Sequence, residues 1–94
     1  MANVTVRIPA ALREFSDGRA EVDLQADTVA SALGALAEHF PLLAQRVTDP
    51  GGAVRPYVNV FVGETSIRDA SGLDTALTNG DVIAVIPAVA GGAV

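Results

Sequence analysis

The last eight residues, PAVAGGAV, hold the one arrangement in this sequence that points to chemistry at the main chain. Gly91 and Gly92 stand side by side and are followed by Ala93 and Val94. Glycine has no Cβ, so a segment that contains it can pass through a narrow channel and adopt the dihedral angles required there. An extended chain from Pro87 to Gly92 spans about 20 Å. Paired glycines are also common in chain termini, so their meaning depends on the element that precedes them.

The other residue types that carry chemistry do not form a recognisable site. Cysteine is absent, which excludes disulfides, thiolate nucleophiles and cysteine-rich zinc sites. His39 is the only histidine, and we expect it to face water late in a helix. The 11 carboxylates are scattered, so spacing singles out no acid–base pair. Neither DPGGAV nor AGGAV joins a strand to a helix with a lysine after it, as a phosphate-binding loop would. We therefore expect no metal bound by this chain.

Charge and hydropathy limit the partners and the location. The formal net charge is -5, and the arginines are scattered from Arg7 to Arg68, which disfavours nucleic-acid binding and favours an electropositive protein partner. Lysine is absent, so the chain offers no ε-amine for attachment to a copy of itself. No apolar run approaches the ~20 residues of a membrane span, and MANVTVRIPA reads as a strand and not as an export signal. We expect a cytoplasmic protein.

Alternating apolar residues predict the strands. The expected strands are 3–8, about 20–25, 57–62, a short one near 65–67, and 82–86. An Asp17-Gly18 turn predicts a loose hairpin between the first two. The last run, VIAVI, does not alternate, which predicts a central strand covered on both sides.

Between the second and third strands the apolar period becomes helical. Val29 to Phe40 forms one apolar stripe, with Asp27 or Thr28 able to cap its start and Pro41 marking its end. A short helical turn in LLAQRV and a loop to residue 56 follow.

This order of elements predicts an α+β fold, a β-grasp or ubiquitin-like roll with a mixed sheet packed on one main helix. Residues 1–87 should form the domain, and residues 88–94 a flexible C-terminal tail that carries the diglycine. The residues predicted for the core are Val4, Val6, Leu33, Leu36, Val58 and Val60.

The third strand is apolar on both faces, because Tyr57 and Phe61 lie opposite the valines. One helix covers one face of a sheet, so this surplus predicts a docking surface for a partner, with Tyr57, Phe61 and Pro87 as the partner-binding residues. The alternative is that the segment 41–56 folds over the same face.

Two stretches carry a family resemblance that extends over essentially the whole chain. NGDVIAVIPAVAGG resembles the turn, last strand, proline and diglycine of the ThiS/MoaD ubiquitin-like sulfur carrier proteins, and PYVNVFVGETSIR is similar to their middle strand. The FP at the helix end, the long middle loop and PAVAGG are most similar to the carrier that supplies a cysteine synthase, and next to the small subunit of molybdopterin synthase. Carriers of thiamin or thiosugar pathways also resemble it.

The resemblance implies a reaction at Gly92. In this family an adenylyltransferase related to ubiquitin-activating enzymes uses ATP with Mg²⁺ to convert the terminal glycine carboxylate into an acyl adenylate. Sulfide or a persulfide then yields a thiocarboxylate, which donates sulfur to a biosynthetic enzyme. The match implies that Val89, Ala90 and Gly91 form the tail that presents Gly92. It also implies that the chain is not itself an enzyme and binds no cofactor, because partner enzymes act on it.

Ala93 and Val94 depart from the family pattern, because they place Gly92 in a peptide bond. The chain would therefore be an inactive precursor until a protease, a zinc metalloprotease in related systems, removes the dipeptide. Two alternatives remain open. The first is a ubiquitin-like modifier joined to lysines of other proteins, and the second is an interaction subunit with an inert tail.

Overall fold

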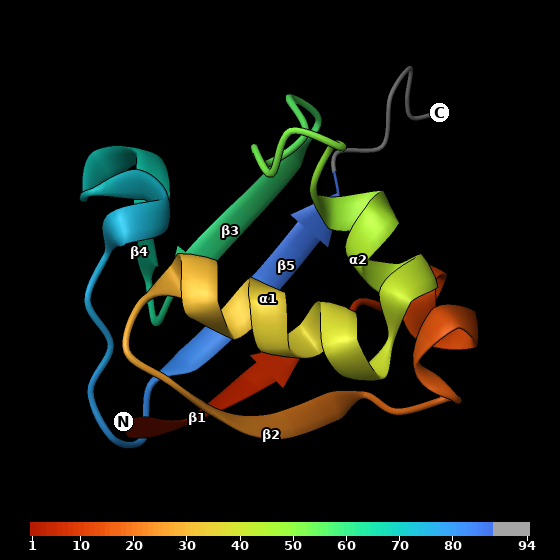
Figure 1. Cartoon of the computed structure of the whole chain (residues 1–94), viewed down its shortest axis with the longest axis horizontal. Helices are drawn as coiled ribbons and strands as arrows, with labels where there is room; N and C mark the ends of the chain where they lie inside the picture. The colour runs from red at the N-terminus through yellow and green to blue at the C-terminus, as the bar shows by residue number, and fades with distance from the viewer. Residues whose placement is uncertain (88–94) are drawn as a thin grey trace.

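The computed structural model describes residues 1–87, which form a five-stranded mixed sheet with helices on one face (Figure 1). The strand order is β2-β1-β5-β3-β4; β1 and β5 are parallel, and the other neighbours are antiparallel. The strands are β1 (Ala2–Arg7), β2 (Glu21–Ala26), β3 (Val58–Val62), β4 (Thr65–Ser66) and β5 (Val82–Pro87). The helices are α1 (Val29–His39) and α2 (Pro41–Val47), with short 3₁₀ segments η1 (Ala10–Ser16), η2 (Ile67–Asp69) and η3 (Gly72–Asp74). This is the expected β-grasp arrangement.

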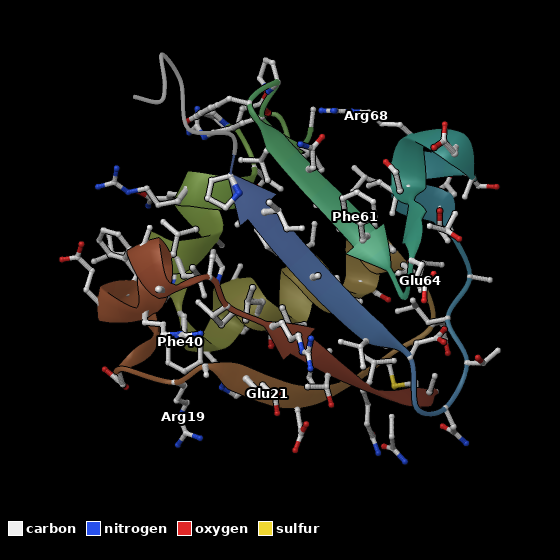
Figure 2. All side chains as sticks on the ribbon, turned by 180° about the vertical axis from the view of Figure 1, so that it is seen from behind. Arg19, Glu21, Phe40, Phe61, Glu64 and Arg68 are labelled. Atoms are coloured by element: carbon white, nitrogen blue, oxygen red, sulfur yellow. The ribbon has the colours of Figure 1, made fainter. Side chains whose placement is uncertain are left out.

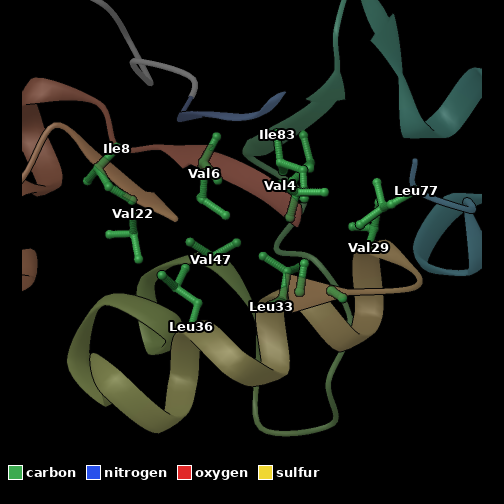
Figure 3. Close-up of a cluster of buried hydrophobic side chains, with 14 of the residues drawn as sticks. Val4, Val6, Ile8, Val22, Val29, Leu33, Leu36, Val47, Leu77 and Ile83 are labelled. Carbon is green, nitrogen blue, oxygen red and sulfur yellow. The ribbon is translucent and has the colours of Figure 1, made fainter. Parts of the chain in front are cut away.

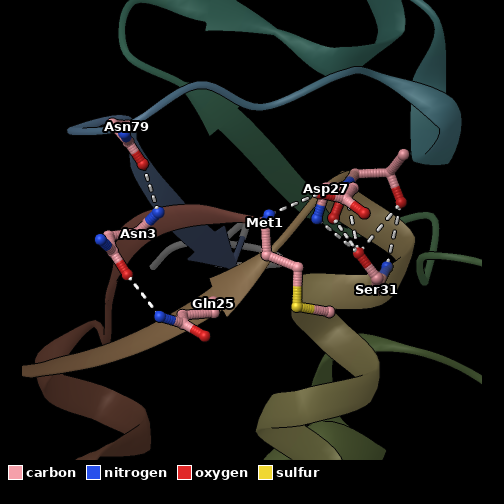
Figure 4. Close-up of polar contacts among 7 residues, drawn as sticks. Met1, Asn3, Gln25, Asp27, Ser31 and Asn79 are labelled. Atoms are coloured by element: carbon pink, nitrogen blue, oxygen red, sulfur yellow. Dashed lines mark hydrogen bonds and ion pairs between the residues drawn. The ribbon is translucent and has the colours of Figure 1, made fainter.

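The start of α1 is fixed by a reciprocal pair of hydrogen bonds (Figure 4). The Ser31 amide donates to Thr28 Oγ1 at 3.2 Å, and the Thr28 amide donates to Ser31 Oγ at 3.0 Å. Of the two predicted caps, Thr28 is therefore the one used. The Asp27 carboxylate instead lies 3.7 Å from the amino group of Met1. Pro41 follows the end of α1 and opens α2, as a proline at the first helical position can.

The core lies between the sheet and the two helices (Figure 3). All six residues predicted for it are buried. Leu43 and Val47 of α2 belong to the same cluster. The segment after α1 therefore packs on the helix side of the sheet, and the alternative in which it covers the opposite face is wrong. None of the helices within residues 1–87 is long and apolar enough to cross a membrane.

The connection between β1 and β2 forms the predicted hairpin, since the two strands pair antiparallel and Asp17 and Gly18 both have positive φ, but it also holds a helical segment that the sequence did not predict. It contains the 3₁₀ segment η1, which ends at Asp17 with a φ of 56°. The Phe15 side chain packs partly against the core, and the Arg46 guanidinium lies 4.7 Å above the centre of its ring. Ser16 is buried and donates its hydroxyl to the Arg19 carbonyl at 2.9 Å. The contacts of Phe15 and the hydrogen bond of Ser16 therefore hold this connection in one conformation.

The strand β5 is central, as predicted, but it is not covered on both sides. Ile83 and Val85 are buried against the helices, whereas Ile86 on the opposite face is 48% exposed. The face of the sheet away from the helices is therefore open, and we call it the outer face (Figure 2).

Candidate functional site

The residues predicted for the tail, for the reaction at its end and for the dipeptide to be removed all lie outside the part of the chain that the structure describes. They are Val89, Ala90, Gly91, Gly92, Ala93 and Val94. The described chain ends at Pro87, the last residue of β5, whose register partner is Val58 of β3. Because Val58 is buried on the helix side, Pro87 does not lie on the outer face with Phe61. It lies at the end of the sheet, from which the C-terminal tail continues.

The outer face is polar over β1 and β2. Three cross-strand pairs cover this half: Arg7–Glu21 at 3.5 Å, Thr5–Asp23 at 2.7 Å and Asn3–Gln25 at 2.9 Å. These pairs satisfy many of the polar groups within the sheet itself, and the side chains that cover this half are polar or charged.

The outer face is apolar over β5 and β3. Phe61 and Ala84 are register partners and are both partly exposed, and Ile86 lies two pairs further along, on the same face. Figure 2 shows Phe61 on this face, with Glu64 at the end of β3 and Arg68 near the start of that strand. We call the residues Phe61, Ala84 and Ile86 the apolar stripe. Exposed apolar area bordered by polar residues is typical of a protein contact surface.

Arg68 fixes the start of β3 beside the apolar stripe. Its guanidinium donates to Asn59 Oδ1 at 2.7 Å, to the Val58 carbonyl at 3.1 Å and to the Pro56 carbonyl at 3.4 Å. These acceptors flank Tyr57, which is 45% exposed in the turn before β3. The sequence carried no signal for this role, because an isolated arginine in a loop does not reveal its acceptors.

The metal-ligating side chains of the described residues do not cluster. Among residues 1–87, no three histidine, cysteine or acidic side chains lie close enough together to hold a metal ion. His39 is exposed at the end of α1, as predicted, with its ring 6.5 Å from that of Phe40. The candidate site therefore consists of a contact surface and the C-terminal tail.

Comparison with known proteins gives the family. The model of the ThiS family matches residues 6–92, which is nearly the whole chain. The chain belongs to the ThiS family. This ThiS-family chain is 36% identical over 92 residues to the sulfur carrier protein CysO of Mycobacterium tuberculosis, covering 96% of this chain and 99% of CysO.

Solved structures agree with this assignment. The crystal structure of Mycobacterium tuberculosis CysO matches with a TM-score of 0.85 and 34% identity over 93% of this chain and all of that one. A chain of the Amycolatopsis orientalis BexX/CysO complex matches with a TM-score of 0.82 and 31% identity, covering 95% of this chain and 99% of that one. Small archaeal modifier protein 1 of Methanosarcina acetivorans matches with a TM-score of 0.86 and 31% identity, covering 98% of each chain. The predicted ubiquitin-like β-grasp fold of this ThiS-family member is confirmed.

Proposed function

We propose that this protein is a sulfur carrier, and that Gly92 becomes its reactive terminus after removal of Ala93 and Val94. The observation that carries the proposal is the extent of the family match, which runs through the diglycine and ends at residue 92. The dipeptide Ala93-Val94 lies beyond that match. The similarity to CysO, a sulfur carrier protein, supports the same role here.

Hydrolysis of the Gly92–Ala93 peptide bond by a protease frees the Gly92 carboxylate. One carboxylate oxygen then attacks the α-phosphorus of ATP, which forms the acyl adenylate and releases pyrophosphate. Sulfide attacks the carbonyl carbon, the bond to AMP breaks, and the product is the Gly92 thiocarboxylate. This sequence gives a poor electrophile a good leaving group and yields a nucleophilic sulfur. ATP with Mg²⁺ belongs to the activating enzyme, an adenylyltransferase of the ubiquitin-activating type.

The activating enzyme docks on the apolar stripe together with Tyr57, and its contact extends to Pro87 at the end of β5. The open outer face supports this part of the proposal, since no described helix lies over the stripe. The related CysO has been crystallised in a complex with BexX. The sulfur acceptor is an enzyme of the cysteine-synthase type, by similarity to CysO; molybdopterin, thiamin and thiosugar enzymes are the other acceptors of this class.

Intact-protein mass spectrometry tests the chemistry. A chain ending at Gly92 and the chain ending at Val94 are each incubated with the activating enzyme, ATP, Mg²⁺ and sulfide. We expect oxygen-for-sulfur exchange only in the chain ending at Gly92. A Gly92→Val variant of the shorter chain is the matched control, because it keeps a free carboxylate but adds a β-branched side chain. Equal thiolation of the chain ending at Val94 would overturn the proposal.

A second function, conjugation to proteins, is favoured by the similarity to small archaeal modifier protein 1. The same Gly92 adenylate would then acylate a lysine amine of a target protein and release AMP. Digestion of the reaction products and mass spectrometry of the target peptides separate the functions. Lysine residues carrying a C-terminal fragment of this chain would favour the modifier, whereas thiocarboxylate without such adducts favours the carrier.

A further inference from the structure

The strand β2 is an open edge of the sheet. Its only partner in the strand order is β1, with which it makes six consecutive register pairs without a bulge. The Ile8 amide donates to the Ala20 carbonyl at 2.8 Å, one register step beyond the last of these pairs. In an antiparallel ladder, bonded pairs alternate with non-bonded ones. Val22 and Leu24 therefore bond to β1, and the main-chain groups of Glu21, Asp23 and Gln25 point outward.

These outward groups have no main-chain partner within the described residues. Main-chain hydrogen bonds on this side of the chain begin only after β2 ends, where the Leu77 amide donates to the Asp27 carbonyl at 2.9 Å. Soluble proteins commonly protect such edges with proline, bulges, very short strands or charged side chains, and of these β2 has only the carboxylates of Glu21 and Asp23. The sequence EVDLQA of β2 contains no proline, and the strand has six residues. The open edge can therefore receive another strand.

A groove runs beside this edge, between β2 and the end of α1. Its volume is about 320 Å³, and its lining residues are Arg19, Glu21, Val22, Asp23, His39 and Phe40. Val22 is buried and Phe40 is partly buried, so together they supply an apolar floor. Figure 2 shows Arg19, Glu21 and Phe40 near one another at the β2 edge of the sheet. A strand added at the edge would place every second side chain over this floor.

The outer-face carboxylates of β2 favour a positively charged occupant, although Arg7 of β1 already lies 3.5 Å from Glu21 and the Thr5 hydroxyl donates to Asp23. Glu21 and Asp23 are two residues apart, so both carboxylates lie on the outer face of one strand. Opposite charges in cross-strand positions attract, and like charges repel. A strand that adds here should carry Arg or Lys at alternate positions, with an apolar residue between them. A second copy of this chain fits less well, because pairing β2 with itself about Asp23 would bring two carboxylates face to face.

We propose that the edge of β2 and its groove bind an extended segment of a partner protein with an apolar–basic–apolar–basic–apolar pattern. The segment adds to the sheet as a sixth strand through the main-chain groups of Glu21, Asp23 and Gln25. Its basic side chains meet Glu21 and Asp23, and an apolar side chain lies on Val22 and Phe40. This surface is separate from the apolar stripe and from the C-terminal tail.

The probe is the peptide acetyl-Val-Arg-Val-Arg-Val-amide, titrated into the full chain labelled with ¹⁵N. We expect saturable shifts of the β2 amides and slower hydrogen exchange at the amides of Glu21, Asp23 and Gln25. A peptide with glutamate in place of arginine should bind at least about tenfold more weakly, the ratio that 1.4 kcal/mol produces. These measurements need no substitution in the chain.

Two variants at one position isolate the main-chain contact. Asp23→Ala removes the carboxylate and keeps the outward N–H, whereas Asp23→Pro removes both. Proline is tolerated at an edge where the N–H does not join the ladder, and retained β1 amide shifts show that the sheet is intact. We expect Asp23→Pro to bind the arginine peptide about tenfold more weakly than Asp23→Ala.

Equal affinity of the two variants, shifts confined to the apolar stripe, or no saturable shift in β2 would overturn the proposal. Dimers that form at high protein concentration and block peptide binding would show that a second copy of the chain occupies the β2 edge. This result would also overturn the proposal. None of these results bears on thiolation of Gly92.

Discussion

Thr28 determines where α1 begins, because its hydroxyl accepts the hydrogen bond from the Ser31 amide that no residue within the helix can accept. We expect Thr28→Ala to lower the free energy of unfolding by about 1 kcal/mol. Urea denaturation monitored by circular dichroism measures this change. Thr28→Ser is the matched control, since serine retains the hydroxyl and should cost less than about 0.5 kcal/mol. Equal losses in both variants would mean that the hydroxyl does not act as the cap.

Phe61 is the aromatic residue of the apolar stripe, and its substitution tests the docking surface. We expect Phe61→Asp to remain folded, because the side chain lies on the outer face, and to lose at least about tenfold in affinity for the activating enzyme. Isothermal titration calorimetry measures the affinity. Gln25→Asp adds the same charge on the polar half of the same face and should bind as the unmodified chain does. Unchanged binding by folded Phe61→Asp would assign the contact elsewhere.

At the scale of elements, β3 depends on a side chain from outside the strand. The Arg68 guanidinium of η2 donates hydrogen bonds to the carbonyls of Pro56 and Val58, on either side of Tyr57, and so stabilises the start of the strand. We expect Arg68→Met to cost about 1 kcal/mol of stability and to speed amide exchange at Val58 and Val60. Arg68→Lys should recover only part of this loss, because an ammonium group cannot reproduce the planar fork. Exchange rates identical to those of the unmodified chain would show that these bonds are not needed.

The sequence predicted the elements whose periodicity comes from burial on one face. Strands β1 and β3 and helix α1 have this property, and their bounds agree with the structure to within a residue or two. The 3₁₀ segment η1 was missed, since seven residues with two partly buried apolar side chains show no period. The prediction that β5 is covered on both sides was wrong, because an unbroken apolar run also fits a strand with one open face.

The candidate site was predictable only in part. The diglycine and the aromatic residues of the third strand are visible in the sequence. The role of Arg68, the edge of β2 and its groove are not, because each depends on which segments the topology brings together.

At the scale of the whole molecule, one core serves both helices and the sheet. Leu36 of α1 is fully buried in it, whereas Leu42 of α2 is 59% exposed. We expect Leu36→Ala to lower the free energy of unfolding by about 2–5 kcal/mol, because the substitution leaves a cavity. Leu42→Ala removes the same atoms from the surface and should change stability by less than about 0.5 kcal/mol. Chemical denaturation compares the two, and similar losses would contradict the described packing.

The central position of β5 has a mechanical consequence. This strand is bonded to β1 on one side and to β3 on the other, and the C-terminal tail continues directly from its end. A partner that pulls on that tail along the strand direction applies a shear force to both ladders. The hydrogen bonds of each ladder then resist the force together and do not break one after another. A pulling force is therefore transmitted to the whole domain. An enzyme that binds the tail and pulls on it would therefore move the folded domain as one rigid body and would not unfold it from its C-terminal end.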